Sequence, residues 1–69
     1  MIEKHSISIM GHRTSVTLES EFWDELKNIS QKQNKSIGQI VAEIDGGRKY
    51  KNLSSNIRVF VLETLKKYQ

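Results

Sequence analysis

Three side chains that form hydrogen bonds occur at every second position near the N-terminus: Arg13, Ser15 and Thr17. In a β-strand they share one face, and the apolar Val16 and Leu18 share the other. Arginine offers a planar fork of donors, and hydroxyl groups both donate and accept. Such a face matches base edges in the major groove of B-DNA, which is about 12 Å wide and admits a two-stranded ribbon. An ordinary solvent-exposed strand face has the same pattern.

The rest of the chain offers few groups for catalysis. The two histidines, His5 and His12, lie in or beside the expected strands, with no cysteine or dense carboxylate cluster near them in sequence. The acidic residues that follow Leu18 lie where a helix N-terminus favours negative charge. Asp45 precedes two glycines but lacks the flanking residues of a phosphate-binding loop. We therefore expect no enzyme activity, no metal site and no cofactor.

Length and composition limit the class of protein further. A chain of 69 residues forms one domain at most, and such a domain buries only roughly 60% of its unfolded surface. It has no cysteines for disulfides or a zinc site, so oligomerisation is the remaining common source of stability. The net charge of +3 and pI near 9.4 suit a polyanionic partner.

We expect a cytoplasmic protein with no membrane partner. The longest purely apolar run, residues 59–62, is far short of the roughly 20 residues that span a bilayer. The N-terminus has no signal-peptide hydrophobic region.

The strand with the alternating polar residues is expected over residues 12–19. Residues 2–10 also alternate, so residues 1–11 form either a second strand or a mobile arm. In the first case Gly11 and His12 would be the central residues of a type II′ turn, with Met10 opposite Arg13.

Apolar residues at helical spacing predict three helices. Asn34 tolerates a left-handed backbone and is expected to end the first. Ser36 and Gln39 have the spacing of a capping box that starts the second. The expected helices span residues 20–33, 36–47 and 53–67. The sequence thus predicts a single domain over residues 1–69, mainly α with a short N-terminal β-ribbon.

This order of elements resembles the ribbon-helix-helix family of the MetJ/Arc type, whose paired strands read the major groove. Residues 13–18 look like the ribbon strand of that family, and residues 34–37 look like its link into the second helix. The segments 11–15, 22–23 and 52–62 further resemble a bacterial subgroup with the pattern GHRTS, FW and NLSSNIRVFVL.

The resemblance implies an intertwined homodimer that binds double-stranded DNA and regulates transcription, with Arg13, Ser15 and Thr17 facing bases. It also implies a phosphate clamp at the start of the second helix, carried by Lys35 and the backbone of Ser36 and Ile37. Further candidates for phosphate contacts are Lys4, His12, Ser54, Ser55 and Arg58. The dimer core would contain Val16, Leu18, Phe22, Trp23, Leu26, Ile29, Ile40, Val41, Ile44, Ile57, Phe60 and Val61.

The third helix leaves alternatives open, because domains of this family usually end after the second. It could replace the second helix, with Ser54, Ser55 and Arg58 forming the clamp. It could instead hold a second protein, as in antitoxins with this type of DNA-binding end. The domain could also be a protein-interaction module without DNA binding, since the net charge is only +3.

Overall fold

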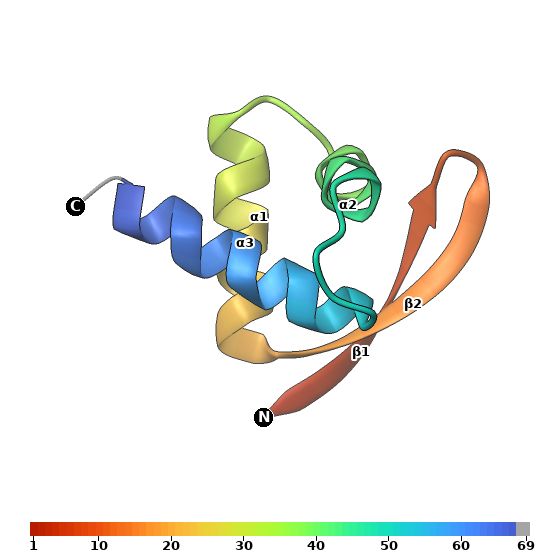
Figure 1. Cartoon of the computed structure of the whole chain (residues 1–69), viewed down its shortest axis with the longest axis horizontal. Coiled ribbons are helices and arrows are strands. Elements are labelled where there is room, and N and C mark those ends of the chain that lie inside the picture. Colours follow the sequence, from red (N-terminus) through yellow and green to blue (C-terminus); the bar gives the residue numbers. More distant parts are fainter. Residues whose placement is uncertain (68–69) are drawn as a thin grey trace.

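A β-hairpin and three helices make up residues 1–67, the part of the chain that the computed structural model describes (Figure 1). The elements are β1 (Ile2–Ile9), β2 (His12–Glu19), α1 (Ser20–Lys32), α2 (Ile37–Gly46) and α3 (Leu53–Lys67). The twisted hairpin lies along one side of the molecule, and the helices gather on the other (Figure 1). This architecture confirms the expected ribbon, two helices and additional C-terminal helix. None of the described helices is long and apolar enough to cross a membrane.

The N-terminal segment forms a strand rather than an arm. β1 pairs antiparallel with β2, and Ser8 lies opposite Arg13. The predicted turn at Gly11–His12, with Met10 opposite Arg13, is therefore wrong. The central turn residues are Met10 (φ 51°) and Gly11 (φ 83°), and positive φ at both positions defines a type I′ turn, whose twist matches that of the strands. The true register differs from the predicted one by two residues, so every side chain keeps its predicted face.

The link between α1 and α2 has the local chemistry that the sequence predicts. Asn34 is left-handed, with φ 54°, and the amides of Asn34 and Lys35 donate to carbonyls in the last turn of α1. These two bonds form a Schellman motif, which satisfies the helix end. Ser36 then caps α2 in a complete capping box with Gln39. The two helices are therefore joined by a short, fixed turn.

One hydrophobic core lies between the inner face of the hairpin and the helices. Its buried members are Ile7, Val16, Leu18, Leu26, Ile29, Ile40, Val41, Ile57 and Val61. Phe22, Trp23, Ile44 and Phe60, also expected in the core, are partly buried at its edge. Burying one large aliphatic side chain contributes about 1.5–3 kcal/mol relative to exposure. A single chain therefore covers the apolar face of β2 without help from a second copy.

An aromatic stack attaches the hairpin to α1. The rings of His5 and Trp23 lie 3.7 Å apart between centroids, with 5° between their planes. The His5 Nε2 atom also lies 3.2 Å from Glu3 Oε1. The stack with Trp23 therefore holds β1 against α1, and the contact with Glu3, within β1, fixes the position of the His5 ring.

The turn assignment can be tested by replacing Met10. A left-handed backbone costs a residue other than glycine or asparagine roughly 1–2 kcal/mol, and Asn-Gly is the preferred type I′ pair. We expect Met10→Asn to raise the free energy of unfolding by up to about 1 kcal/mol, measured by urea denaturation. His12→Asn is the control, and it should give no gain. The opposite order of the two variants would support the Gly11–His12 turn.

Candidate nucleic-acid interface

Polar side chains from both strands gather on the outer face of the hairpin, turned away from the helices. The register pairs Ser8 with Arg13, Ser6 with Ser15, and Lys4 with Thr17. These six residues, which we call the outer face, are all exposed. Alternation along each strand places them on one side of the sheet. The three residues predicted to contact bases are therefore together, and three from β1 join them.

Sequence reasoning did not include Ser6 and Ser8, and considered Lys4 for phosphate contact alone. Their alternation was visible, but only the pairing of β1 with β2 shows that they share a surface with Arg13. The outer face combines two cations with four hydroxyl groups. One chain thus presents a two-stranded antiparallel ribbon, the width of structure that the major groove admits.

Ion pairing separates the cations of the outer face from other candidates. Among residues 1–67, neither Lys4 nor Arg13 lies within 4.0 Å of a carboxylate oxygen. By contrast, Lys35 Nζ lies 2.8 Å from Glu43 Oε2. Lys35 must release this carboxylate before it binds a phosphate, whereas the two outer-face cations are available.

Arg58 is held by a carboxylate from a distant part of the chain. Its Nε atom lies 2.8 Å from Glu19 Oε1, and its Nη2 atom lies 3.2 Å from Glu19 Oε2. The hydrogen bond from Arg58 lowers the pKa of Glu19 below its ordinary value of 4.5. Glu19 occupies the N-cap position of α1 but makes no capping bond there. The pair therefore ties α3 to the junction between β2 and α1.

The backbone amides at the start of α3 are also engaged. Asn52 Oδ1 accepts the amide of Ser54 at 2.8 Å and that of Ser55 at 3.3 Å. Both serines are partly buried. This end of α3 is consequently capped by its own chain, which leaves less room for a phosphate.

The N-terminus of α2 keeps amides that an anion can use. Ser36 Oγ accepts the Gln39 amide, and Gln39 Oε1 accepts the Ser36 amide. The first backbone hydrogen bond of the α-helical pattern runs from the Ile40 amide to the Ser36 carbonyl. The amides of Ile37 and Gly38 precede it and have no helical acceptor. Such amides bind anions, so the expected clamp backbone is available at Ile37, but the Ser36 amide is already bonded.

Gly38 brings this end of α2 directly onto the hairpin. A Cβ atom added at Gly38 would lie 2.4 Å from the carbonyl oxygen of Ser8. No side chain fits there, because real Cβ contacts are longer. The first turn of α2 therefore rests on β1 at an outer-face residue.

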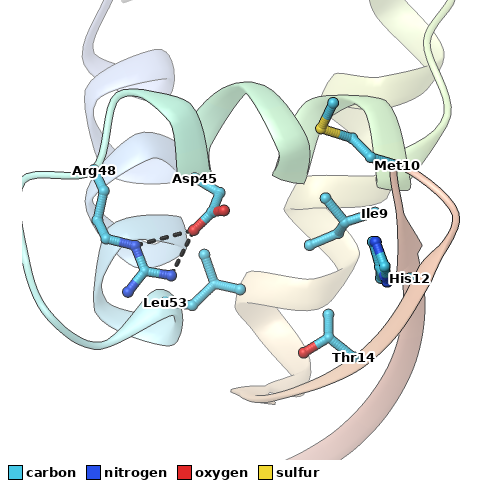
Figure 2. A pocket seen from close by; sticks show the side chains of 7 residues that line it. All are labelled: Ile9, Met10, His12, Thr14, Asp45, Arg48 and Leu53. Carbon is cyan, nitrogen blue, oxygen red and sulfur yellow. Dashed lines mark hydrogen bonds and ion pairs between the residues drawn. The ribbon is translucent and has the colours of Figure 1, made fainter.

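His12 lies at the hairpin tip but not on the outer face. It is opposite Ile9 and borders an open cavity of about 320 Å³ between the tip and the segment after α2 (Figure 2). The other lining residues are Ile9, Met10, Thr14, Asp45, Arg48 and Leu53. Across residues 1–67, no three histidine, cysteine or acidic side chains gather closely enough to hold a metal ion.

Comparison with known families gives one match. A family model described as a ribbon-helix-helix domain matches residues 2–65, a span that includes both strands and nearly all of α3. Neither the comparison with curated proteins nor that with solved structures gives a match.

The contact between α2 and β1 predicts the effect of a single methyl group. Gly38→Ala should lower the free energy of unfolding by about 1–3 kcal/mol, because the backbone must shift to admit the new atom. Gly46→Ala is the matched control in the same helix, where an added Cβ meets nothing within 4 Å. That variant should be neutral, or more stable by up to about 1 kcal/mol. Equal denaturation midpoints for the two variants would contradict the close approach.

Proposed function

Since the chain belongs to the ribbon-helix-helix family, we propose that it is a sequence-specific DNA-binding protein that regulates transcription. Members of this family are typically DNA-binding regulators or antitoxins and are generally not enzymes. The single observation that carries the proposal is the outer face, where two cations and four hydroxyl groups lie on one exposed two-stranded ribbon.

In this proposal the hairpin enters the major groove with its outer face toward the bases. Arg13 can bond bidentately to guanine, and Ser15 and Thr17 can donate to or accept from several bases. Lys4 lies opposite Thr17, near the open end of the hairpin. It would contact a phosphate at the groove wall, because a lysine ammonium is a point charge.

The backbone of α2 would hold a second phosphate. The amides of Ile37 and Gly38 point out of the helix start that rests on β1, so they flank the inserted ribbon. Lys35 would exchange Glu43 for the phosphate, an exposed ion pair that costs little to open. Ser36 would act indirectly, since its hydroxyl fixes the first turn of α2.

We further propose that two copies bind DNA as a homodimer, the assembly typical of the family. The sequence suggested an intertwined dimer in which each copy supplies one ribbon strand. Within one chain β1 pairs with β2, and Val16 and Leu18 are buried. Since β2 has one strand neighbour within the described chain, its other edge would pair antiparallel with β2 of the second copy, and the dimer would present Arg13, Ser15 and Thr17 twice.

Fluorescence anisotropy with duplexes selected from a random pool tests the reading of bases. Arg13→Ala should weaken binding to the selected duplex by about 10-fold to 100-fold or more, because one bidentate pair supplies about 1–3 kcal/mol of discrimination. Lys27→Ala is the control, since Lys27 is an exposed cation paired with Asp24 on α1, and it should bind like wild type.

Unchanged affinity of Arg13→Ala would contradict the assignment of the outer face. Sedimentation of the same samples gives the number of 8.0 kDa chains per duplex. One chain per selected site would contradict the homodimer.

A second candidate function is that of an antitoxin that binds its toxin through α3. The observation that favours it is the exposure of Leu62 and Leu65, which are 50% and 40% exposed. An antitoxin gene normally lies beside its toxin gene, so the neighbouring gene product is the partner to test. Co-expression should yield a complex that Leu62→Ser with Leu65→Ser disrupts while DNA binding persists. A neighbour that is neither toxic nor bound would rule this function out.

A further inference from the structure

Strand β1 supplies half of the outer face, through Lys4, Ser6 and Ser8. All three are exposed, and Lys4 has no carboxylate oxygen within 4.0 Å among residues 1–67. Ammonium and hydroxyl groups bind base edges and phosphate oxygens alike. Side-chain chemistry therefore does not separate the two targets, but the position of β1 in the sheet of the proposed dimer does.

One hydrogen bond at the open end of the hairpin gives the direction of the backbone groups in both strands. The Ser20 amide donates to the Met1 carbonyl at 2.8 Å, so these residues extend the register by one hydrogen-bonded pair. Such pairs alternate with non-hydrogen-bonded pairs along an antiparallel ladder. The backbone groups of even-numbered residues in β2 therefore point to β1, and those of Arg13, Ser15 and Thr17 point to the opposite edge. That edge is the one through which β2 would pair with a second copy.

The same alternation applies to β1. Its odd-numbered residues bond to β2, so the backbone groups of Lys4, Ser6 and Ser8 point to the edge that faces away from β2. The close approach of Gly38 to the carbonyl oxygen of Ser8 agrees with this direction. The start of α2 thus lies at the outer edge of β1, beside Ser8. Both would lie on the outside of a sheet that two copies form through β2.

Strand spacing decides what β1 meets when such a sheet enters the major groove. Neighbouring strands lie about 4.8 Å apart, so each β2 lies about 2.4 Å from the two-fold axis of the dimer and each β1 about 7.2 Å from it. The groove is about 12 Å wide, so its walls lie about 6 Å from its centre line. Only the two central β2 strands therefore fit over the bases. The two β1 strands lie at the walls, next to the phosphate backbones.

We propose that β1 is a backbone-binding strand, whose residues Lys4, Ser6 and Ser8 contact phosphates of double-stranded DNA while β2 alone reads bases. This inference rests on the proposed function, in which β2 pairs with β2 of a second copy. The amides of Lys4 and Ser6, at the outer edge, are further donors to phosphate oxygens. Because the start of α2 lies at the same edge, each copy holds one wall of the groove, and its partner holds the other.

Salt-dependent binding of Ser6→Lys, measured by fluorescence anisotropy, tests the position of β1. Ser6 lies opposite Ser15, so the new cation meets no like charge directly across the sheet. Each added phosphate contact steepens the slope of log affinity against log salt concentration by about 0.9, and the dimer gains two. The variant should bind selected and unrelated duplexes more tightly by the same factor. Between 50 and 200 mM salt, its affinity should fall about 12-fold more than that of wild type.

Gln31→Lys is the matched control, because it adds the same charge at another exposed position. Gln31 lies in the last turn of α1, on the side of the molecule away from the hairpin (Figure 1). This variant should keep the wild-type slope. The comparison separates a cation placed at the DNA backbone from a general increase in net charge.

The outcomes also separate this inference from the proposed function. If Arg13→Ala weakens binding but Ser6→Lys gives the same affinity and slope as Gln31→Lys, β2 still reads DNA and β1 does not meet its backbone. If Ser6→Lys selects a different sequence from a random pool, β1 reads bases and the phosphate assignment is wrong. If the wild-type protein binds no duplex, both the proposed function and the inference are overturned.

Discussion

The burial of Val16 and Leu18 against helices of the same chain is the constraint on which the rest of the molecule depends. Side chains alternate along a strand, so sealing these two residues in the core turns Arg13, Ser15 and Thr17 toward solvent. The pairing with β1 extends that division to a second strand. A slip of one residue in either strand would reverse its faces and expose the apolar set. The polar character of the outer face is thus a direct consequence of core packing.

Electrostatic pairing adds a second level of organisation. Carboxylates neutralise cations that shape the fold, such as Arg58 at the β2–α1 junction and Arg48 in the loop after α2. On the hairpin, by contrast, Lys4 and Arg13 have no carboxylate oxygen within 4.0 Å among residues 1–67. Since a paired cation must give up its partner before it binds an anion, Lys4 and Arg13 are more readily available to an anion than Lys35 or Arg58.

The features that could be predicted from the sequence depend on interactions between residues close together in the chain. Alternation predicted the faces of β2, Asn34 predicted a left-handed helix end, and Ser36 with Gln39 predicted the capping box. Each of these features involves residues a few positions apart. The turn was misplaced because a two-residue shift keeps every face the same, so alternation cannot separate the two registers. A hydrophobic pattern also does not indicate that the backbone of Met10 adopts a left-handed conformation.

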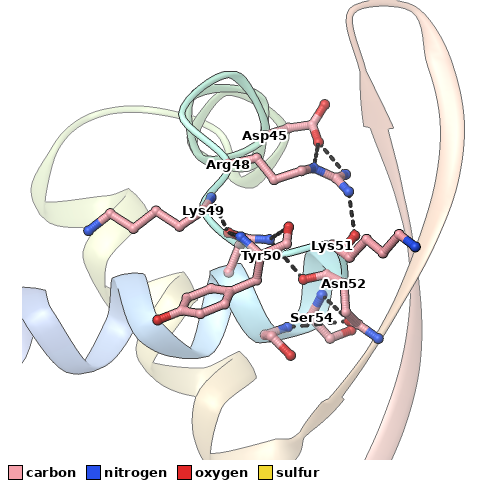
Figure 3. Close-up of polar contacts among 9 residues, drawn as sticks. Asp45, Arg48, Lys49, Tyr50, Lys51, Asn52 and Ser54 are labelled. Atoms are coloured by element: carbon pink, nitrogen blue, oxygen red, sulfur yellow. Dashed lines mark hydrogen bonds and ion pairs between the residues drawn. The ribbon is translucent and has the colours of Figure 1, made fainter.

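Contacts between distant parts of the chain account for the features that could not be predicted from the sequence. The pairing of Glu19 with Arg58 joins residues 39 positions apart, and it engages a guanidinium that the sequence offers as a candidate phosphate ligand. Asn56 lies within an apolar helical pattern, where nothing indicates that its side chain organises the preceding loop. Asn56 is buried, accepts the amides of Lys49 and Tyr50, and donates to the carbonyls of Tyr50 and Asn52, an arrangement that forms only once α3 packs against the core (Figure 3).

The central claim is that the outer face of the hairpin meets DNA, and mapping of backbone amide shifts by NMR tests it most directly. On titration with a selected duplex, the account predicts that the largest shifts occur on β1 and β2 and at the start of α2. The C-terminal turns of α1 and α3 should remain unchanged. Shifts concentrated at those C-terminal turns, with the hairpin unaffected, would contradict the account.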